Sequence, residues 1–261
     1  MTTLIKFLTT LLKAGLSYHS LNSAKSAVLA IIPDENKEGN NRLLSQFMKG
    51  AYEAQPVFPR YTATWDVNKV FKLLRTWENE KVTLKQITFK IAMLLLLLSG
   101  RRGSSVIQIN TTDVIIDEER AIIKISHVTK TTRPGYHVPD IVIRRYHDVN
   151  ICIVKCLEVY IKRTKAVRLS PALIISFKTF KAISRDTLSR WIKMILKQAG
   201  INLNLFKPHS TRAAAASKAL KNMSIANIMS TVGWRNADTI ARFYAKPIVD
   251  ESAFAEQVLD L

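Results

Sequence analysis

Two stretches in the last third of the chain decide its fold: PHSTRAAAA at residues 208–216 and GWRNADTIARFY at residues 233–244. In the first, His209 and Arg212 are three residues apart, so at the start of a helix their side chains project from neighbouring faces toward one point. The N-terminus of that helix also attracts an anion. Small and apolar residues from Ala213 onward predict close helix packing up to Gly233, and the second stretch places Trp234 and Tyr244 on the next turn and helix. The pattern therefore predicts helix ends that gather polar side chains around an anion.

A third stretch, SGRRGS at residues 99–104, adds Arg102 far upstream. Breaking a phosphodiester without a metal needs a nucleophile, cationic donors for the phosphate oxygens and an acid for the leaving oxygen. Arginine suits the second task, because its planar fork stays charged and grips phosphate with two donors. With Trp234 and Tyr244, these residues predict phosphodiester chemistry without metal or cofactor. The competing interpretation makes Trp234 a helix-packing residue and Tyr244 a core aromatic.

The charge of the whole chain points to a polyanionic partner. Its 39 Lys and Arg residues outnumber 20 Asp and Glu residues, which gives a net charge of +19 over 261 residues. A field of this sign attracts nucleic acid, although a merely basic soluble protein has the same composition. The length allows two lobes, and PVFPR at residues 56–60 breaks helix and strand alike. We expect a helical domain at 1–55, a linker at 56–62, a larger domain at 63–248 and an amphipathic tail at 249–261.

Hydrophobic periodicity predicts a mainly α fold with a small antiparallel β-sheet, an α+β class. Apolar spacing predicts helices, and β-branched runs predict strands. The expected helices cover residues 4–31 as a hairpin broken at 15–17, then 43–52, 65–77, 84–98 and a helix from Ser184 to Gly200, and the expected strands cover 106–109, 114–116, 121–125 and 136–143. The apolar run 91–98 is far shorter than the roughly 20 residues that span a bilayer, so it predicts a buried core helix and no membrane partner.

Cys152 and Cys156 lie four residues apart on one expected helix face. One helical turn does not suit a structural disulfide, and two thiols without other ligands do not form a zinc site. They are expected to be buried, reduced thiols of an intracellular protein. The first residues lack the layout of a secretory signal.

Taken as an ordered set, the chain resembles the tyrosine recombinase (phage integrase) family. More narrowly it resembles the recombinases of eukaryotic mobile elements of the Crypton and DIRS kind. The likeness is carried by KTTRPG at 130–135, RDTLSRWIK at 185–193 and HSTRAAA at 209–215, together with the spaced arginines, tryptophan and tyrosine. It covers residues 60–248 well and residues 4–50 loosely. The resemblance implies a helical core-binding lobe and a catalytic domain, although only about three helices fit before Pro56.

The resemblance implies that Tyr244 is the nucleophile, which forms a 3′-phosphotyrosyl link and frees a 5′-hydroxyl. Arg102 and Arg212 would hold the scissile phosphate, because the family motif places the arginine two residues after glycine. Arg101 would then contact a backbone phosphate or be exposed. The family often has a carboxylate three residues after this arginine, where this chain has Ser105.

The resemblance also implies roles in proton transfer and in DNA contact. His209 would assist proton transfer, and Trp234, where many members have histidine, would pack and donate its indole N–H. Lys130 would protonate the leaving 5′ oxygen. The alternative is that Lys130 is an ordinary solvated lysine in a turn, because Lys124 lies six residues earlier on the preceding strand. The expected DNA contacts are Arg101, Lys207, Arg133 and Arg190.

The implied function is DNA recombination or integration for a mobile element in a nucleus, on double-stranded DNA. The enzyme would be a monomer alone and a tetramer on DNA, because exchange between two sites involves four strands. One alternative is relaxation of supercoils by a type IB topoisomerase-like monomer. The other is a catalytically silent DNA-binding protein, favoured by Ser105 and the short N-terminal lobe. In the tail, Phe254, Val258 and Leu261 would pack on a neighbouring subunit or on the same chain.

Overall fold

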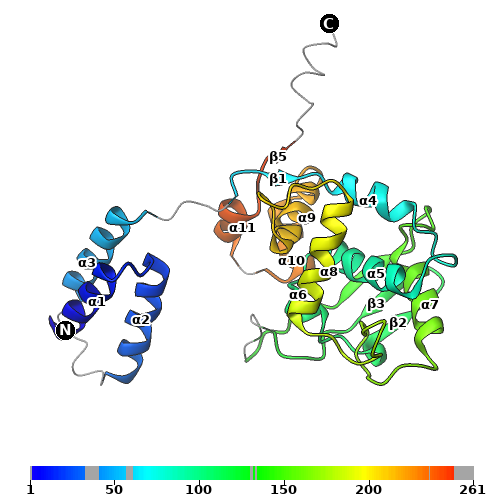
Figure 1. Ribbon diagram of the computed structural model, residues 1–261, viewed down its shortest axis with the longest axis horizontal. Coiled ribbons are helices and arrows are strands. Elements are labelled where there is room, and N and C mark those ends of the chain that lie inside the picture. Colours follow the sequence, from blue (N-terminus) through cyan, green and yellow to red (C-terminus); the bar gives the residue numbers. More distant parts are fainter. Residues whose placement is uncertain are drawn as a thin grey trace, which may run out of the picture. The chain divides into compact units, whose positions relative to one another are not determined.

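The computed structural model describes residues 2–32, 41–56, 61–129, 132, 134–234 and 236–249. The chain forms two compact units, Met1–Arg60 and Tyr61–Leu261 (Figure 1). Lys130, Arg133 and the side chains expected in the tail at 250–261 lie outside the described residues.

The first unit holds three described helices, α1 (Thr2–Lys13), α2 (Tyr18–Ile31) and α3 (Asn41–Ala54). Ser17 caps α2, since its hydroxyl accepts the N–H of Ser20, and this separates α1 from α2 at the expected break. A small core joins the three helices, with Leu8 and Leu21 fully buried at its centre. The predicted hairpin and third helix are therefore confirmed.

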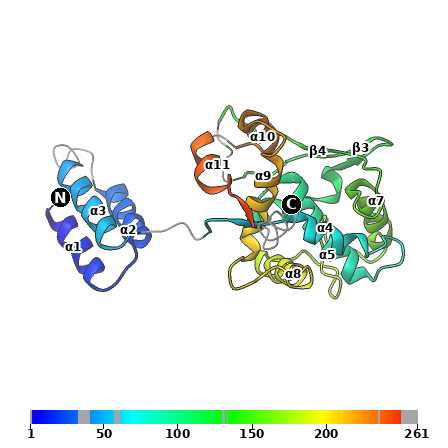
Figure 2. The same ribbon diagram turned by 90° about the horizontal axis from the view of Figure 1, so that it is seen from above.

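The second unit is built around one helix that is buried on nearly all sides. Its helices are α4 (Val67–Arg75), α5 (Leu84–Ser99), α6 (Gly103–Val106), α7 (Ile153–Thr164), α8 (Arg185–Gln198), α9 (Thr211–Ala219), α10 (Ile225–Val232) and α11 (Ala237–Phe243). α7, α8 and α9 all pack on α5, which lies at the centre of the unit (Figures 1 and 2). This packing explains the apolar run, because nearly every face of α5 meets another element. No described helix is long and apolar enough to cross a membrane.

The sheet of this unit is antiparallel, in the order β2 (Val114–Ile116), β3 (Arg120–Ile123), β4 (Ile141–Arg144). Ala121 of β3 lies opposite Ile116 and Ile143, and α7 packs against the sheet. The predicted class, mainly α with a small antiparallel sheet, is confirmed.

The two cysteines, Cys152 and Cys156, are free, buried thiols at the start of α7, and burial raises the pKa of Cys156 to about 12.

Three local predictions were wrong. Residues 106–109 form no strand, because the chain after Gly100 turns tightly into α6: the N–H of Val106 donates to the carbonyl of Arg102. The β-branched residues there fill the core instead, and Val106 is fully buried. The strand expected from residue 136 begins at Ile141. Trp65 lies in a strand and not in a helix.

That strand, β1 (Thr64–Trp65), pairs in parallel with β5 (Ile248–Val249), so it joins the two ends of the second unit. The N–H of Thr64 donates to the carbonyl of Pro247 at 2.8 Å. The indole N–H of Trp65 donates to the Ser210 hydroxyl at 2.8 Å, at the start of α9. β1 therefore ties together the segments that precede α9 and follow α11.

Candidate active site

The end of α5 places the two upstream arginines. Gly100 ends the helix in the left-handed conformation, with φ of 60°, and the chain reverses into Arg101 and Arg102. Arg102 precedes the first turn of α6 in extended conformation and is half-buried. A tight turn at the end of α5 therefore positions this arginine.

His209 and Arg212 come from a turn that is fixed from both sides. Residues Pro208–Ser210 form one 3₁₀ turn that leads directly into α9. The Ser210 hydroxyl accepts from Trp65 and donates to the carbonyl of Lys207 at 2.8 Å, which holds this turn on β1. His209 is exposed, whereas Arg212 is only 6% exposed.

One cavity of about 290 Å³ brings four of the predicted residues together. Its wall contains Arg101 and Arg102 from one segment and, more than a hundred positions later in the sequence, His209 and Arg212. The first turns of α8 complete the wall with two residues that sequence reasoning missed, Arg185 and Ser189. The N-cap pattern locates the start of α8, but no spacing in the sequence shows which cavity its first turn faces.

Aromatic rings cover the guanidinium of Arg212. Its Cζ lies 4.4 Å from the ring centroid of Trp234 and 5.1 Å from that of Tyr244. The two rings stack at 4.5 Å with an interplanar angle of 30°. Burial lowers the pKa of Arg212 to about 10; Tyr244 acts in the opposite direction, and the positive charges of Arg102 and Arg101 lower the pKa further. The guanidinium thus stays charged near neutral pH, at a cost that a bound anion would reduce.

Several buried donors around this stack have no acceptor within the described part of the chain. They are Nε and Nη1 of Arg212, Nε1 of Trp234 and Nε of Arg101. A buried donor without a partner costs about 1–3 kcal/mol, and native structures contain few of them. Donors of this number and charge, gathered at one place, match the oxygens of an anion such as a phosphate group.

Arg101 is not exposed, which corrects one of the two expectations for it. Burial lowers the pKa of its guanidinium, and Nη2 donates to the carbonyl of Pro139. The side chain stands beside Gly233, where Nη1 would lie 2.9 Å from a Cβ on that residue. Arg101 thus packs against Gly233, the residue before Trp234. Its contact with DNA stays a prediction.

We expect replacement of Gly233 by alanine to destabilise the second unit by about 2–5 kcal/mol. Gly233 has a φ of +71°, and an added Cβ would lie 2.9 Å from atoms of Arg101, Pro139 and Val138. Gly200 is the matched control, since its φ is +74° with nothing within 4 Å of an added Cβ. Gly200→Ala should cost only the backbone term, about 1–2 kcal/mol. Equal losses for the two variants in urea unfolding would contradict the close approach at Gly233.

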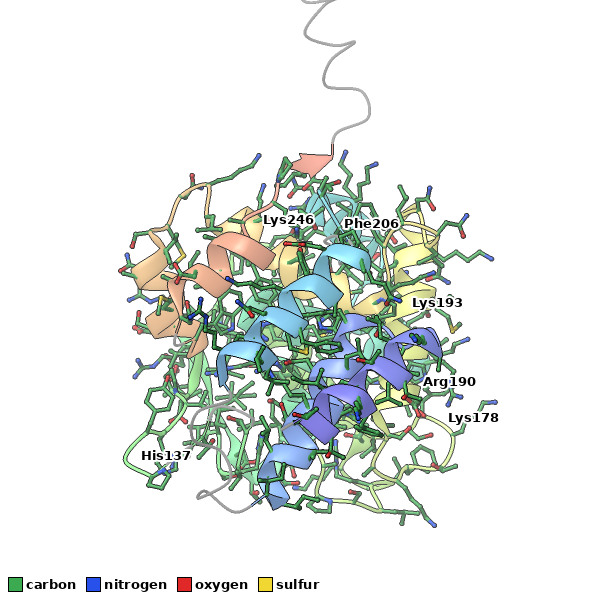
Figure 3. The ribbon with its side chains drawn as sticks, turned by 90° about the vertical axis from the view of Figure 1, so that its left-hand side faces the viewer. His137, Lys178, Arg190, Lys193, Phe206 and Lys246 are labelled. Atoms are coloured by element: carbon green, nitrogen blue, oxygen red, sulfur yellow. The ribbon has the colours of Figure 1, made fainter. Side chains whose placement is uncertain are left out.

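Two further predicted DNA contacts, Lys207 and Arg190, lie within the described residues. Lys207 is half-buried, and its ammonium group donates to the carbonyl of Leu203 at 2.9 Å. Arg190 is exposed on α8 and donates to the Thr187 hydroxyl at 3.0 Å. Figure 3 shows Arg190 at one edge of the second unit with Lys193 and Lys178, all of them exposed. This edge is basic, as a contact with a polyanion requires.

Comparison with known proteins identifies the family. The family described as "Phage integrase family" matches residues 65–249. Among solved structures, the XerH site-specific recombinase bound to difH substrate superimposes with a TM-score of 0.61 at 13% identity, covering 100% of this chain and 70% of that one. The Tn1549 transposon integrase in complex with circular intermediate DNA gives 0.59 at 15% identity, covering 99% and 85%. XerA recombinase gives 0.53 at 17% identity, covering 97% and 80%.

Because these identities are low, the likeness to the solved structures shows the fold alone. No curated protein sequence matches the chain significantly. The family match spans the whole segment that carries both arginines, the histidine, the tryptophan and the tyrosine. The chain belongs to the phage integrase family of tyrosine recombinases.

Proposed function

We propose that this protein cuts and rejoins double-stranded DNA through a covalent bond between Tyr244 and a 3′ phosphate. One observation carries the proposal: Arg212 lies buried against the rings of Trp234 and Tyr244 while Nε and Nη1 have no acceptor among the described residues. A phosphate that accepts from these nitrogens would lie beside the phenol of Tyr244. The half-buried ring of Tyr244 is not enclosed in the core.

The chemistry is an exchange of one phosphoester bond for another. The Tyr244 oxygen attacks phosphorus and loses its proton, the bond to the 5′ oxygen breaks, and that oxygen takes up a proton. Arg102 and Arg212 hold the two non-bridging oxygens as charge develops on them. His209 assists proton transfer on its side of the cavity, and Lys130 is the proposed acid for the 5′ oxygen. Attack by a 5′-hydroxyl on the phosphotyrosine reverses these steps and rejoins a strand.

Trp234 stands where many members of the family have histidine, and its proton chemistry differs from that of histidine. An indole N–H donates one hydrogen bond and neither accepts one nor titrates near neutral pH. Its Nε1 is buried without an acceptor among the described residues, as a donor reserved for substrate would be. Trp234 would therefore orient a phosphate oxygen and cover Arg212, while proton transfer falls to other residues.

The proposed substrate and assembly follow from charge and chemistry. A net charge of +19 favours duplex DNA, and the exposed basic residues of α8 supply phosphate contacts. XerH and the Tn1549 integrase were both solved with DNA. Site-specific recombination exchanges four strands, so we propose a tetramer on two DNA sites. From the resemblance to the recombinases of Crypton and DIRS elements, we further propose that the protein is the recombinase of a mobile element and acts in a nucleus.

The test is a duplex with a nick beside the scissile phosphate, which loses a short strand after cleavage and traps the protein. The wild-type chain is expected to give a denaturant-resistant protein–DNA complex, with the nucleotide attached to a peptide that contains Tyr244. DNA binding with a steep salt dependence but no such complex would overturn the proposal in favour of a silent binding protein. Ser105, in place of the usual carboxylate, is the observation that favours this second candidate. Plasmid relaxation without joining of two sites would instead indicate topoisomerase activity.

A further inference from the structure

The chain immediately after the proposed nucleophile is held by one buried side chain on another helix. The hydroxyl of Ser217, in α9, donates to the carbonyl of Tyr244 at 2.6 Å. The same oxygen accepts the N–H of Lys246 at 3.1 Å. Ser217 is only 6% exposed, so water competes little for either bond. One hydroxyl thus bridges the peptide groups on both sides of Ala245.

This bridge completes a pair of anchors around the tyrosine. On the upstream side, the carbonyl of Ile240 accepts the N–H groups of Tyr244 at 2.9 Å and Ala245 at 2.8 Å, and the Ile240 side chain is fully buried. On the downstream side Ser217 holds the carbonyl of Tyr244 itself. The Cα of the tyrosine is therefore fixed from two elements, while its side chain keeps its own torsions.

Ser217 also lies on the same short helix as the phosphate-binding arginine. α9 runs from Thr211 to Ala219, so Arg212 and Ser217 are five residues apart on one rigid element. The arginine side chain reaches the ring of Tyr244, and the serine holds its backbone. A single helix therefore sets the distance between the proposed nucleophile and the group that holds its target.

We propose that Ser217 is a positioning residue for Tyr244, which aligns the phenol with the phosphate held by Arg212. This inference rests on the proposed function of the site. A shift of about 1 Å in a reacting group can cost about 100-fold in rate, so loss of the bridge should slow cleavage without weakening DNA binding. The two bonds of the Ser217 hydroxyl that form this bridge go to backbone groups, so its effect on the phenol is expected to pass through the backbone.

The experiment compares three variants of the full chain on the nicked duplex at saturating DNA. Ser217→Ala removes the hydroxyl, and Ser217→Thr keeps one. Thr164→Val is the control, because that buried hydroxyl in α7 also both donates and accepts: it donates to the carbonyls of Tyr160 and Ile161 and accepts from Arg168. We expect Ser217→Ala to lower the single-turnover cleavage rate by about 10- to 100-fold. The Kd for DNA should stay unchanged, the threonine variant should restore the rate, and the control should match wild type.

Amide exchange at Lys246 gives a readout that does not need activity. Ser217→Ala should speed this exchange, because the N–H loses its acceptor. Wild-type cleavage with an unaffected alanine variant would overturn the role of Ser217 and leave the proposed function standing. Equal losses in the alanine and threonine variants would also overturn it, since the hydroxyl would not be the cause. A wild-type chain that forms no covalent complex would overturn the proposed function, even if exchange at Lys246 responds as expected.

Discussion

Tyr244→Phe should form no covalent complex with the nicked duplex, with a loss of at least about 10⁴-fold in cleavage. The substitution removes one oxygen and keeps the ring. The stack on Trp234 and the contact with Arg212 depend on that ring, at 4.5 and 5.1 Å, so they should persist. DNA affinity and the free energy of unfolding are therefore expected to match wild type. Gel separation in denaturant after incubation with labelled duplex measures the adduct.

Tyr146→Phe is the control for this experiment. Tyr146 is 45% exposed, and it follows β4 at the edge of the sheet. The variant should form the adduct at the wild-type rate. An adduct that survives in Tyr244→Phe would show that another residue is the nucleophile, and peptide mapping of that adduct would identify it.

The second large effect is expected for Arg212→Gln, which should lower cleavage by about 100- to 1000-fold. Glutamine can still donate a hydrogen bond, but it carries no charge to offset the charge that develops on phosphate. Arg212→Lys should recover little of this rate, because an ammonium group lacks the planar fork that lies against Trp234 and Tyr244. Single-turnover cleavage at saturating DNA measures both variants.

The stability of Arg212→Gln separates a functional role from a structural one. Burial lowers the pKa of this arginine, which means that its charged form is held in the folded chain at a cost. Removing the charge should therefore not lower the free energy of unfolding by more than about 1 kcal/mol. Arg120→Gln, an exposed change on β3 that removes a surface ion pair with Asp117, should lower the free energy of unfolding by less than about 1 kcal/mol and leave cleavage unaltered. Wild-type cleavage in Arg212→Gln would contradict the assigned phosphate site.

Long periodic segments could be predicted from the sequence, whereas only some of the short ones could. α8 begins after Ser184 and carries the expected buried stripe, because capping and apolar spacing are local properties. The strand predicted at residues 106–109 was wrong because β-branched residues occur in a buried core as readily as in a strand. The conformation of these residues depends on the turn at Gly100 and on the helices that pack around that turn. Likewise β1 has two residues and no local signal, since its partner lies near the other end of the unit.

The sequence by itself determined the set of chemical groups and the helices that carry them: two spaced arginines, a histidine, a tryptophan and a late tyrosine, with a charge suited to DNA. Only the tertiary structure decided how these groups face one another. It placed Arg212 against both rings, buried Arg101 beside Gly233 and set the Ser217 hydroxyl on the carbonyl of Tyr244. The reason is physical: periodicity and capping act within a few residues, whereas a contact across 27 residues arises when helices pack on a shared core.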